Sequence, residues 1–141
     1  MTETYDLIVV GGGSGGLAHA QRAVEYGAKV LVIESGRLGG TCVNVGCVPK
    51  KVMWYAASLA HDQHLAAGYG FPSSPDEHDW SHLKATRDAY VKRLNGIYEG
   101  NLERKSITVV NGRAKFVDAN TVAVGETHYS ATYLTIATGG Y

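Results

Sequence analysis

Near the start of the chain, Tyr5-Asp6-Leu7-Ile8-Val9-Val10 runs directly into Gly11-Gly12-Gly13-Ser14-Gly15-Gly16. The first half is a short apolar run rich in β-branched residues, which is typical of a strand buried on both faces of a parallel sheet. Residues 17–26, which are followed by Gly27, are predicted as a helix. Gly11, Gly13 and Gly16 therefore satisfy the pattern G-x-G-x-x-G in the strand–turn–helix setting of a dinucleotide-binding site.

Each glycine of this pattern has a separate role. Gly11 permits the turn, Gly13 lets the backbone approach a pyrophosphate, and Gly16 lets the helix pack on the strand. A second strand is predicted at residues 29–33, with Glu34 at its end. A carboxylate there accepts hydrogen bonds from a ribose diol, which favours an unphosphorylated adenosine ribose over that of NADP. At this point NAD and FAD both stay open, and so does a glycine turn that serves packing alone.

The only two cysteines lie in the segment Gly39-Gly40-Thr41-Cys42-Val43-Asn44-Val45-Gly46-Cys47-Val48-Pro49-Lys50-Lys51. A disulfide between them closes a small ring, whose chain-entropy contribution is only about 2 kcal/mol. Pro49 fits the first turn of a helix, which places Cys47 at a helix N-terminus where the thiolate form is favoured. We interpret the pair as a redox-active dithiol. The alternative is a pair of buried small hydrophobic residues.

Composition excludes several classes of protein. Thirteen Lys and Arg balance thirteen Asp and Glu among 141 residues, so no overall field recruits nucleic acid or an anionic membrane. No segment offers about 20 consecutive apolar residues, and the N-terminus has no secretory pattern. We expect one domain over residues 1–141, with a cytoplasmic location and no membrane or nucleic-acid partner. His61 and His64 lack an evident third ligand, so no metal site is expected.

The dithiol segment resembles the redox-active signature of the flavoprotein pyridine nucleotide-disulfide oxidoreductases. The resemblance extends through Val52-Met53-Trp54, the glycine pattern and Ala137-Thr138-Gly139-Gly140, so it covers nearly the whole chain. It implies that the cofactor of this domain is FAD. Within the family the chain is most similar to members that reduce glutathione disulfide with NADPH. This implies an enzyme with a Cys42–Cys47 redox-active disulfide.

The resemblance also assigns roles to individual residues. Cys42, on the irregular and more accessible side, is the thiol that attacks the substrate disulfide, and Cys47 stacks against the flavin. Lys50 is the lysine beside the reactive flavin nitrogen, although a solvated surface charge is its alternative. The implied cofactor contacts are Gly11, Gly13, Ser14, Gly15, Gly16, Glu34, Ser35, Gly40, Thr41, Cys42, Cys47, Lys50, Gly112, Ala114, Ala137, Thr138 and Gly139.

Four residues match substrate-binding positions of the family: Ser14, Arg22, Tyr90 and Tyr98. Gln21 stands where the family often has an arginine, next to Arg22. The two tyrosines have a core role as their alternative, because they belong to an apolar stripe on a helix predicted from residue 80 to about 102 with Asp79 as its N-cap. That stripe comprises Leu83, Tyr90, Val91, Leu94, Ile97, Tyr98 and Leu102, and we expect most of it in the core.

The remaining elements complete the predicted fold. A helix is expected over residues 52–65, a loop over 68–75, and parallel strands over 107–110 and 133–136. Short alternating segments at 112–117, 121–124 and 127–130 predict an antiparallel meander. The fold class is therefore α/β, a Rossmann-like parallel sheet with helices and a three-stranded antiparallel meander. This is an incomplete FAD-binding domain.

Family members are several times longer and carry NADPH, central and interface domains, which are absent here. None of the six histidines is followed by proline, whereas the family's general acid is such a histidine, supplied across a dimer interface. We therefore expect the FAD-binding part of a homodimeric parent, with little activity and a weakly held flavin on its own. The alternatives are a reductase of another disulfide, such as trypanothione, and a non-catalytic flavin-binding module or truncated reading frame.

Overall fold

A computed structural model describes residues 2–72 and 77–140, and a six-stranded sheet forms its centre. The strand order is β3-β2-β1-β6-β5-β4. The strands are β1 (Thr2–Val10), β2 (Val30–Glu34), β3 (Thr108–Asn111), β4 (Lys115–Phe116), β5 (Thr121–Val124) and β6 (Thr127–Ile136). The helices are α1 (Ser14–Val24), α2 (Gly40–Asn44), α3 (Cys47–Ala66), the 3₁₀ turn η1 (Ala67–Tyr69) and α4 (Trp80–Arg104).

The sheet is parallel on one side and antiparallel on the other. β3, β2, β1 and β6 run parallel, with Val9 of β1 opposite Val32 of β2 and Thr135 of β6. β4, β5 and β6 are joined in an antiparallel meander. The predicted α/β class, with a parallel sheet and a three-stranded meander, is therefore confirmed.

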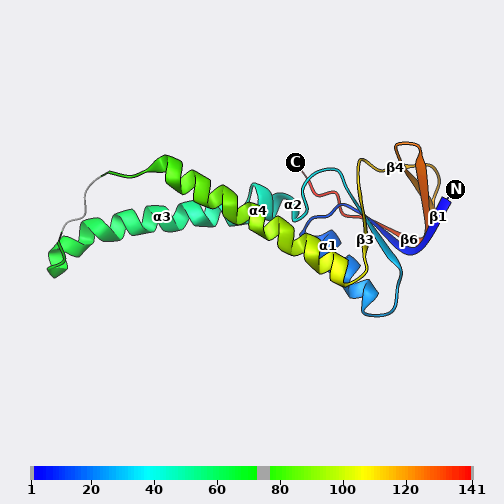
Figure 1. The fold of residues 1–141 in the computed structure, drawn as a ribbon, viewed down its shortest axis with the longest axis horizontal. Coiled ribbons are helices and arrows are strands. Elements are labelled where there is room, and N and C mark those ends of the chain that lie inside the picture. The colour runs from blue at the N-terminus through cyan, green and yellow to red at the C-terminus, as the bar shows by residue number, and fades with distance from the viewer. Residues whose placement is uncertain (1, 73–76, 141) are drawn as a thin grey trace.

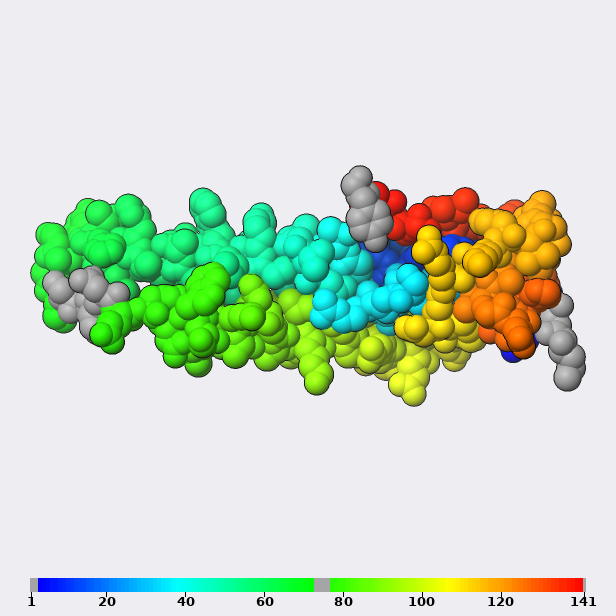
Figure 2. Space-filling model, turned by 90° about the horizontal axis from the view of Figure 1, so that it is seen from above, coloured from blue at the N-terminus to red at the C-terminus, as the bar shows by residue number. Residues whose placement is uncertain are grey.

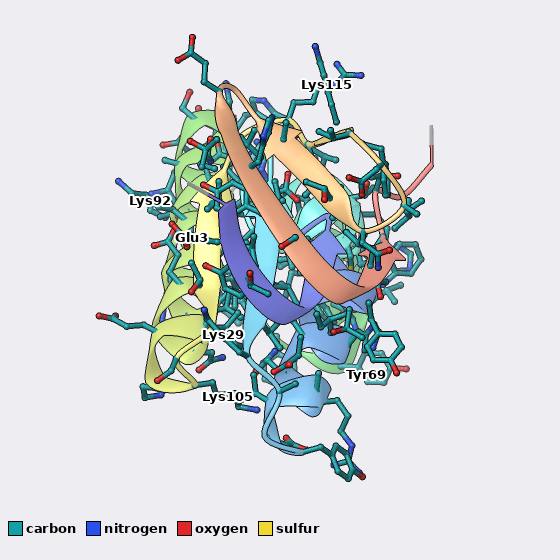
Figure 3. The ribbon with its side chains drawn as sticks, turned by 90° about the vertical axis from the view of Figure 1, so that its right-hand side faces the viewer. Glu3, Lys29, Tyr69, Lys92, Lys105 and Lys115 are labelled. Carbon is teal, nitrogen blue, oxygen red and sulfur yellow. The ribbon has the colours of Figure 1, made fainter. Side chains whose placement is uncertain are left out.

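Both faces of β1 and β2 are buried, which explains their continuous apolar runs. One core cluster holds Leu7, Val9 and Val32 against α1, through Leu17, and against α4, through Leu102. On the opposite face a second cluster joins Ile8 and Leu31 to Val122 and Tyr129 of the meander. In this chain the second face is thus covered by strands rather than by helices. Figure 3 shows these strands as broad ribbons in front of the helices.

The molecule is elongated because two long helices extend well beyond the sheet (Figure 1). α3 and α4 lie side by side along this arm (Figure 2). α4 begins where predicted, with Asp79 accepting a hydrogen bond from the His82 backbone N–H at 2.9 Å. α3 buries none of its side chains, although it carries Trp54, Tyr55 and Leu59.

Four predictions about elements were wrong in detail. The first helix begins at Ser14 rather than residue 17. The predicted strands at 127–130 and 133–136 form one strand, β6, which pairs with β1 from His128 to Ile136 with the one exception of Thr132. The segment 112–117 keeps only the two-residue β4. The stripe on α4 is mostly not core, since only Val91 and Leu102 of it are buried. Part of the loop predicted at 68–75 lies outside the described residues.

Leu17 offers a test of the helix–sheet core, because its side chain is only 2% exposed in the first cluster. We expect Leu17→Ala to lower the free energy of unfolding by about 2–5 kcal/mol, through lost burial and the cavity left behind. Urea denaturation followed by circular dichroism measures this change. Leu59→Ala is the matched control, since Leu59 is 63% exposed on α3 and its loss is expected to cost no more than about 0.5 kcal/mol. Equal losses for the two variants contradict the assignment of the core.

Candidate functional site

The glycine loop between β1 and α1 is so tightly packed that two of its positions exclude a side chain. Gly11 has φ +114°, and a Cβ there would lie 2.2 Å from the carbonyl oxygen of Ala137. A Cβ on Gly16 would lie 1.9 Å from the carbonyl oxygen of Gly11 and 3.1 Å from Val9. Glycine at these positions therefore lets α1 sit directly on the end of β1 and lets the C-terminal tail cross beside the loop.

The outer side of the same loop is open. A Cβ on Gly13 would meet only the Cα of Gly40, at 3.7 Å, and a Cβ on Gly15 would meet nothing within 4 Å. Gly13 is the N-cap of α1, and no side chain caps this helix. The first backbone N–H groups of α1, beginning at Ser14, have no acceptor within the helix. This end of α1 therefore presents N–H donors and a positive dipole end to an anionic group.

The carboxylate of Glu34, at the end of β2, is held in place by two backbone N–H groups. Its Oε2 accepts a hydrogen bond from Gly12 at 2.6 Å, and its Oε1 accepts one from Gly36 at 2.7 Å. A carboxylate has about four acceptor sites, so capacity remains for further donors such as a ribose diol. Ser35, the next residue, is exposed.

The carboxyl edge of the sheet brings the remaining predicted cofactor contacts to the same place. The Gly112 N–H donates to the Glu34 carbonyl oxygen at 2.9 Å, and the Ala137 N–H donates to the Val10 carbonyl oxygen at 2.8 Å. Ala114 packs against the second core cluster. Thr138 and Gly139 follow Ala137 and are exposed. Tail, glycine loop and Glu34 thus form one continuous surface.

The dithiol segment reaches this surface through Gly40. A Cβ on Gly40 would lie 2.8 Å from the Cα of Gly13, and the Gly39 N–H donates to the Gly12 carbonyl oxygen at 2.8 Å. Thr41, exposed, follows at the start of α2. The start of α2 therefore lies directly against the turn that the sequence assigns to a pyrophosphate.

The two cysteines lie on different helices. Cys42 lies in α2 and is half-buried, whereas Cys47 is the first residue of α3 and is exposed. The expectation that Cys42 lies on the irregular and more accessible side was therefore wrong for this chain, because the segment before Cys47 folds into a short helix. Lys50 is exposed one turn further along α3 and makes no ion pair with the residues that the structure describes.

The two thiols interact. A hydrogen bond to the Cys47 side chain, with a smaller contribution from desolvation, raises the pKa of the Cys42 thiol above its ordinary value. Cys42 therefore keeps its proton to higher pH than a free thiol does. Thiols in hydrogen-bond contact are placed to exchange between dithiol and disulfide.

The predicted substrate-binding residues do not form one cluster. Ser14 begins α1, but Arg22 lies in its last turn, about 12 Å further along the axis. There Arg22 pairs with Glu25 at 2.5 Å and contacts Tyr26. Tyr98 packs against the first core cluster, in agreement with its alternative core role, and Tyr90 is exposed.

Sequence reasoning missed a pair of amides behind the dithiol. Asn95 of α4 donates to Asn44, which stands between the cysteines. Asn95 lies four residues after Val91 and seven before Leu102, so it shares their helix face. A polar residue on a predicted apolar face was the signal that could have identified it.

Among residues 2–72 and 77–140, no helix is long and apolar enough to cross a membrane. No group of three or more His, Cys, Asp or Glu side chains among them could hold a metal ion.

Comparisons with known proteins show the family to which the chain is similar. Residues 5–141 match the family model described as pyridine nucleotide-disulphide oxidoreductase. The chain is 50% identical to the glutathione reductase of Schizosaccharomyces pombe over 149 aligned positions, covering all of this chain and 32% of that protein. It is 56% identical to the glutathione reductase of Debaryomyces hansenii, covering 82% of this chain and 25% of that protein. For the Yarrowia lipolytica glutathione reductase the identity is 52%, with 96% and 32% covered. The chain thus spans about a third or less of the length of these relatives.

The contact between the two thiols predicts a shift in reactivity. Because Cys47 raises the pKa of Cys42, we expect Cys47→Ala to lower that pKa. Cys42 then becomes thiolate at lower pH, and its alkylation by iodoacetamide near neutral pH becomes faster. The pH dependence of the rate, with the modified site identified by mass spectrometry, measures this. Val48→Ala keeps both thiols and is expected to leave the Cys42 profile in place. If the pH dependence of Cys42 alkylation in Cys47→Ala is unchanged or moves to higher pH, the assigned contact between the two thiols is wrong.

Proposed function

The chain belongs to the pyridine nucleotide-disulphide oxidoreductase family, and from this membership we propose that it is the FAD-binding part of a reductase of glutathione disulfide. In the longer parent the electrons come from NADPH, whose binding residues lie outside these 141. The proposal includes Cys42 and Cys47 as the redox-active pair and a cytoplasmic, homodimeric parent. All three relatives are glutathione reductases, which supports glutathione disulfide as the substrate.

The contact between Gly40 and Gly13 carries the proposal. The two Cα atoms belong to the dithiol segment and to the nucleotide turn, and they are too close for a side chain on Gly40. A dinucleotide whose pyrophosphate lies on the turn therefore has the dithiol segment as its immediate neighbour. If the glycine turn only packed the helix on the strand, the close approach of Gly40 to Gly13 would have no role.

The residues present fit FAD. The open positions Gly13 and Gly15, with the N–H groups from Ser14 onward, suit a pyrophosphate, and the oriented carboxylate of Glu34 suits the adenosine diol. We propose that these groups, with Thr41, Ala114 and Thr138 on the same surface, hold the cofactor, and that Cys47 and Lys50 face its redox-active ring. The chemistry that bound FAD supplies is two-electron transfer to a disulfide.

The chain's own thiols carry out the exchange with substrate. Cys42 as thiolate attacks one sulfur of the small disulfide, whose S–S bond breaks as one substrate thiol leaves. Cys47 then attacks the Cys42 sulfur, forms the Cys42–Cys47 bond and releases the second thiol. Two electrons and two protons thus pass from the dithiol to the two product thiols.

The raised pKa of Cys42 makes a proton acceptor necessary for the first step. None of the six histidines precedes proline, as the family's acid–base residue does. We propose that this group comes from outside these residues. α3 leaves three large apolar side chains exposed: Trp54, Tyr55 and Leu59. They support a surface on which a second subunit of a homodimeric parent packs, and such a subunit could bring the missing proton acceptor.

Flavin binding tests the proposal directly. We expect the chain to bind FAD weakly, with quenching of flavin fluorescence as the measurement. Gly13→Val, which fills the open side of the turn, is expected to weaken binding by at least about tenfold, or about 1.4 kcal/mol. Gly100→Ala on α4, where a Cβ meets nothing within 4 Å, is the matched control and is expected to leave binding unchanged.

Two results contradict the proposed site. If the unsubstituted chain and the Gly13→Val variant bind flavin equally well, the cofactor lies elsewhere. Complete absence of flavin binding, with the fold intact by circular dichroism, removes the FAD-binding role of these residues.

A further inference from the structure

Asn95 is an unusual residue in this fold. Among the residues whose burial the structure describes, it is the only buried polar or charged side chain, with 8% of its surface exposed. It lies on α4 between Val91 and Leu102, where an apolar residue is expected. A buried amide in such a place has a desolvation cost that its hydrogen bonds must offset.

Both hydrogens of the Asn95 amide are used. Its Nδ2 donates to the Leu38 carbonyl oxygen at 2.8 Å and to Asn44 Oδ1 at 3.0 Å. The Asn44 Nδ2 in turn lies within 3.2 Å of the carbonyl oxygens of Arg37 and Leu38 and 2.9 Å from that of Gly40. Because Asn95 donates to Oδ1, the Nδ2 of Asn44 must point at these carbonyls. We call these two side chains the Asn44–Asn95 amide pair.

The amide pair holds the segment that carries the thiols. Asn44 stands two residues after Cys42 and three before Cys47, at the end of the five-residue α2. A helix this short has no stability of its own in water, so its position depends on tertiary contacts. Packing supplies one of them through Val43, which is 4% exposed. At Asn44, which is half-buried and lines an open pocket of about 450 Å³, the amide pair supplies another.

We propose that Asn95 is a positioning residue for the dithiol, acting through Asn44 to set the equilibrium between the Cys42–Cys47 disulfide and the two thiols. This inference rests on the proposed redox role of the pair. With α2 held by the amide pair, the thiols are already adjacent in the reduced chain, so closing the bond costs little further chain entropy. Without Asn95 the reduced segment gains freedom that the disulfide removes, and the disulfide becomes easier to reduce.

The test is equilibration of the 141-residue chain in glutathione buffers. The chain dithiol reacts with one glutathione disulfide to give the Cys42–Cys47 disulfide and two glutathione thiols, so atoms and electrons balance. Acid quenching, alkylation and mass spectrometry give the equilibrium constant. We expect Asn95→Leu to lower it by about tenfold, which is about 30 mV for this two-electron couple. Asn95→Asp keeps the shape but removes both donors, and it is expected to have a similar effect.

Val91→Ala is the matched control, because Val91 is 4% exposed on the same helix face one turn earlier. It is expected to lower the free energy of unfolding but to change the exchange constant by less than twofold. A constant for Asn95→Leu and Asn95→Asp that stays within twofold of the unsubstituted chain reduces Asn95 to an ordinary core residue and overturns the proposal. Asn44→Ala removes the same contact from the other side. If the Asn95 variants do not fold, the exchange constant of Asn44→Ala is measured instead, and a value within twofold of the unsubstituted chain overturns the proposal. If neither position tolerates substitution, the pair is needed for folding rather than for tuning, and the proposal is wrong.

The outcome separates this inference from the function on which it rests. If the unsubstituted chain forms no Cys42–Cys47 disulfide in any of the buffers, the proposed redox function fails. If it forms one and the Asn95 variants match it, only the positioning role fails.

Discussion

The contact of Gly40 with Gly13 is the constraint on which the site depends. Two turns from different parts of the chain meet there, backbone against backbone, at a distance that no side chain on Gly40 would allow. This approach places the dithiol beside the end of α1, where N–H donors and the helix dipole favour an anionic group. A methyl group at this contact would separate the nucleotide surface from the thiols, although every strand of the sheet could still form.

The glycine contact is supported from two sides. On the sheet side, Glu34 takes backbone hydrogen bonds from Gly12 and Gly36 and so joins the end of β2 to the turn after β1. On the helix side, Asn44 and Asn95 connect α2 and the preceding loop to α4. The region around the site is therefore held by hydrogen bonds on two sides. The α3–α4 arm, which extends away from the sheet (Figure 1), instead leaves large apolar side chains exposed.

Much of the fold could be predicted because it depends on short-range patterns. The apolar runs of β1 and β2, the glycine turn and the Asp79 cap each carry their signal within a few neighbouring residues. The continuity of β6 could not be predicted, because it depends on pairing between distant segments: Ser130 pairs with β1 and β5, and Ala131 pairs with β1. The helix around Cys42 was missed because five residues are too few to show a helical period.

The sequence by itself determined the chemistry of the site: a dinucleotide turn, an acid at the end of the second strand and a pair of closely spaced thiols. Each of these features is a set of residue types at a fixed spacing. That spacing determines whether the glycine turn can bind a nucleotide and how small a ring the disulfide closes. Only the tertiary structure decided which thiol is the less exposed, that the Cys47 side chain raises the pKa of Cys42, and that Asn95 reaches Asn44 across 51 residues of sequence. Burial and hydrogen bonding between distant segments depend on how the elements pack, and no local pattern contains that information.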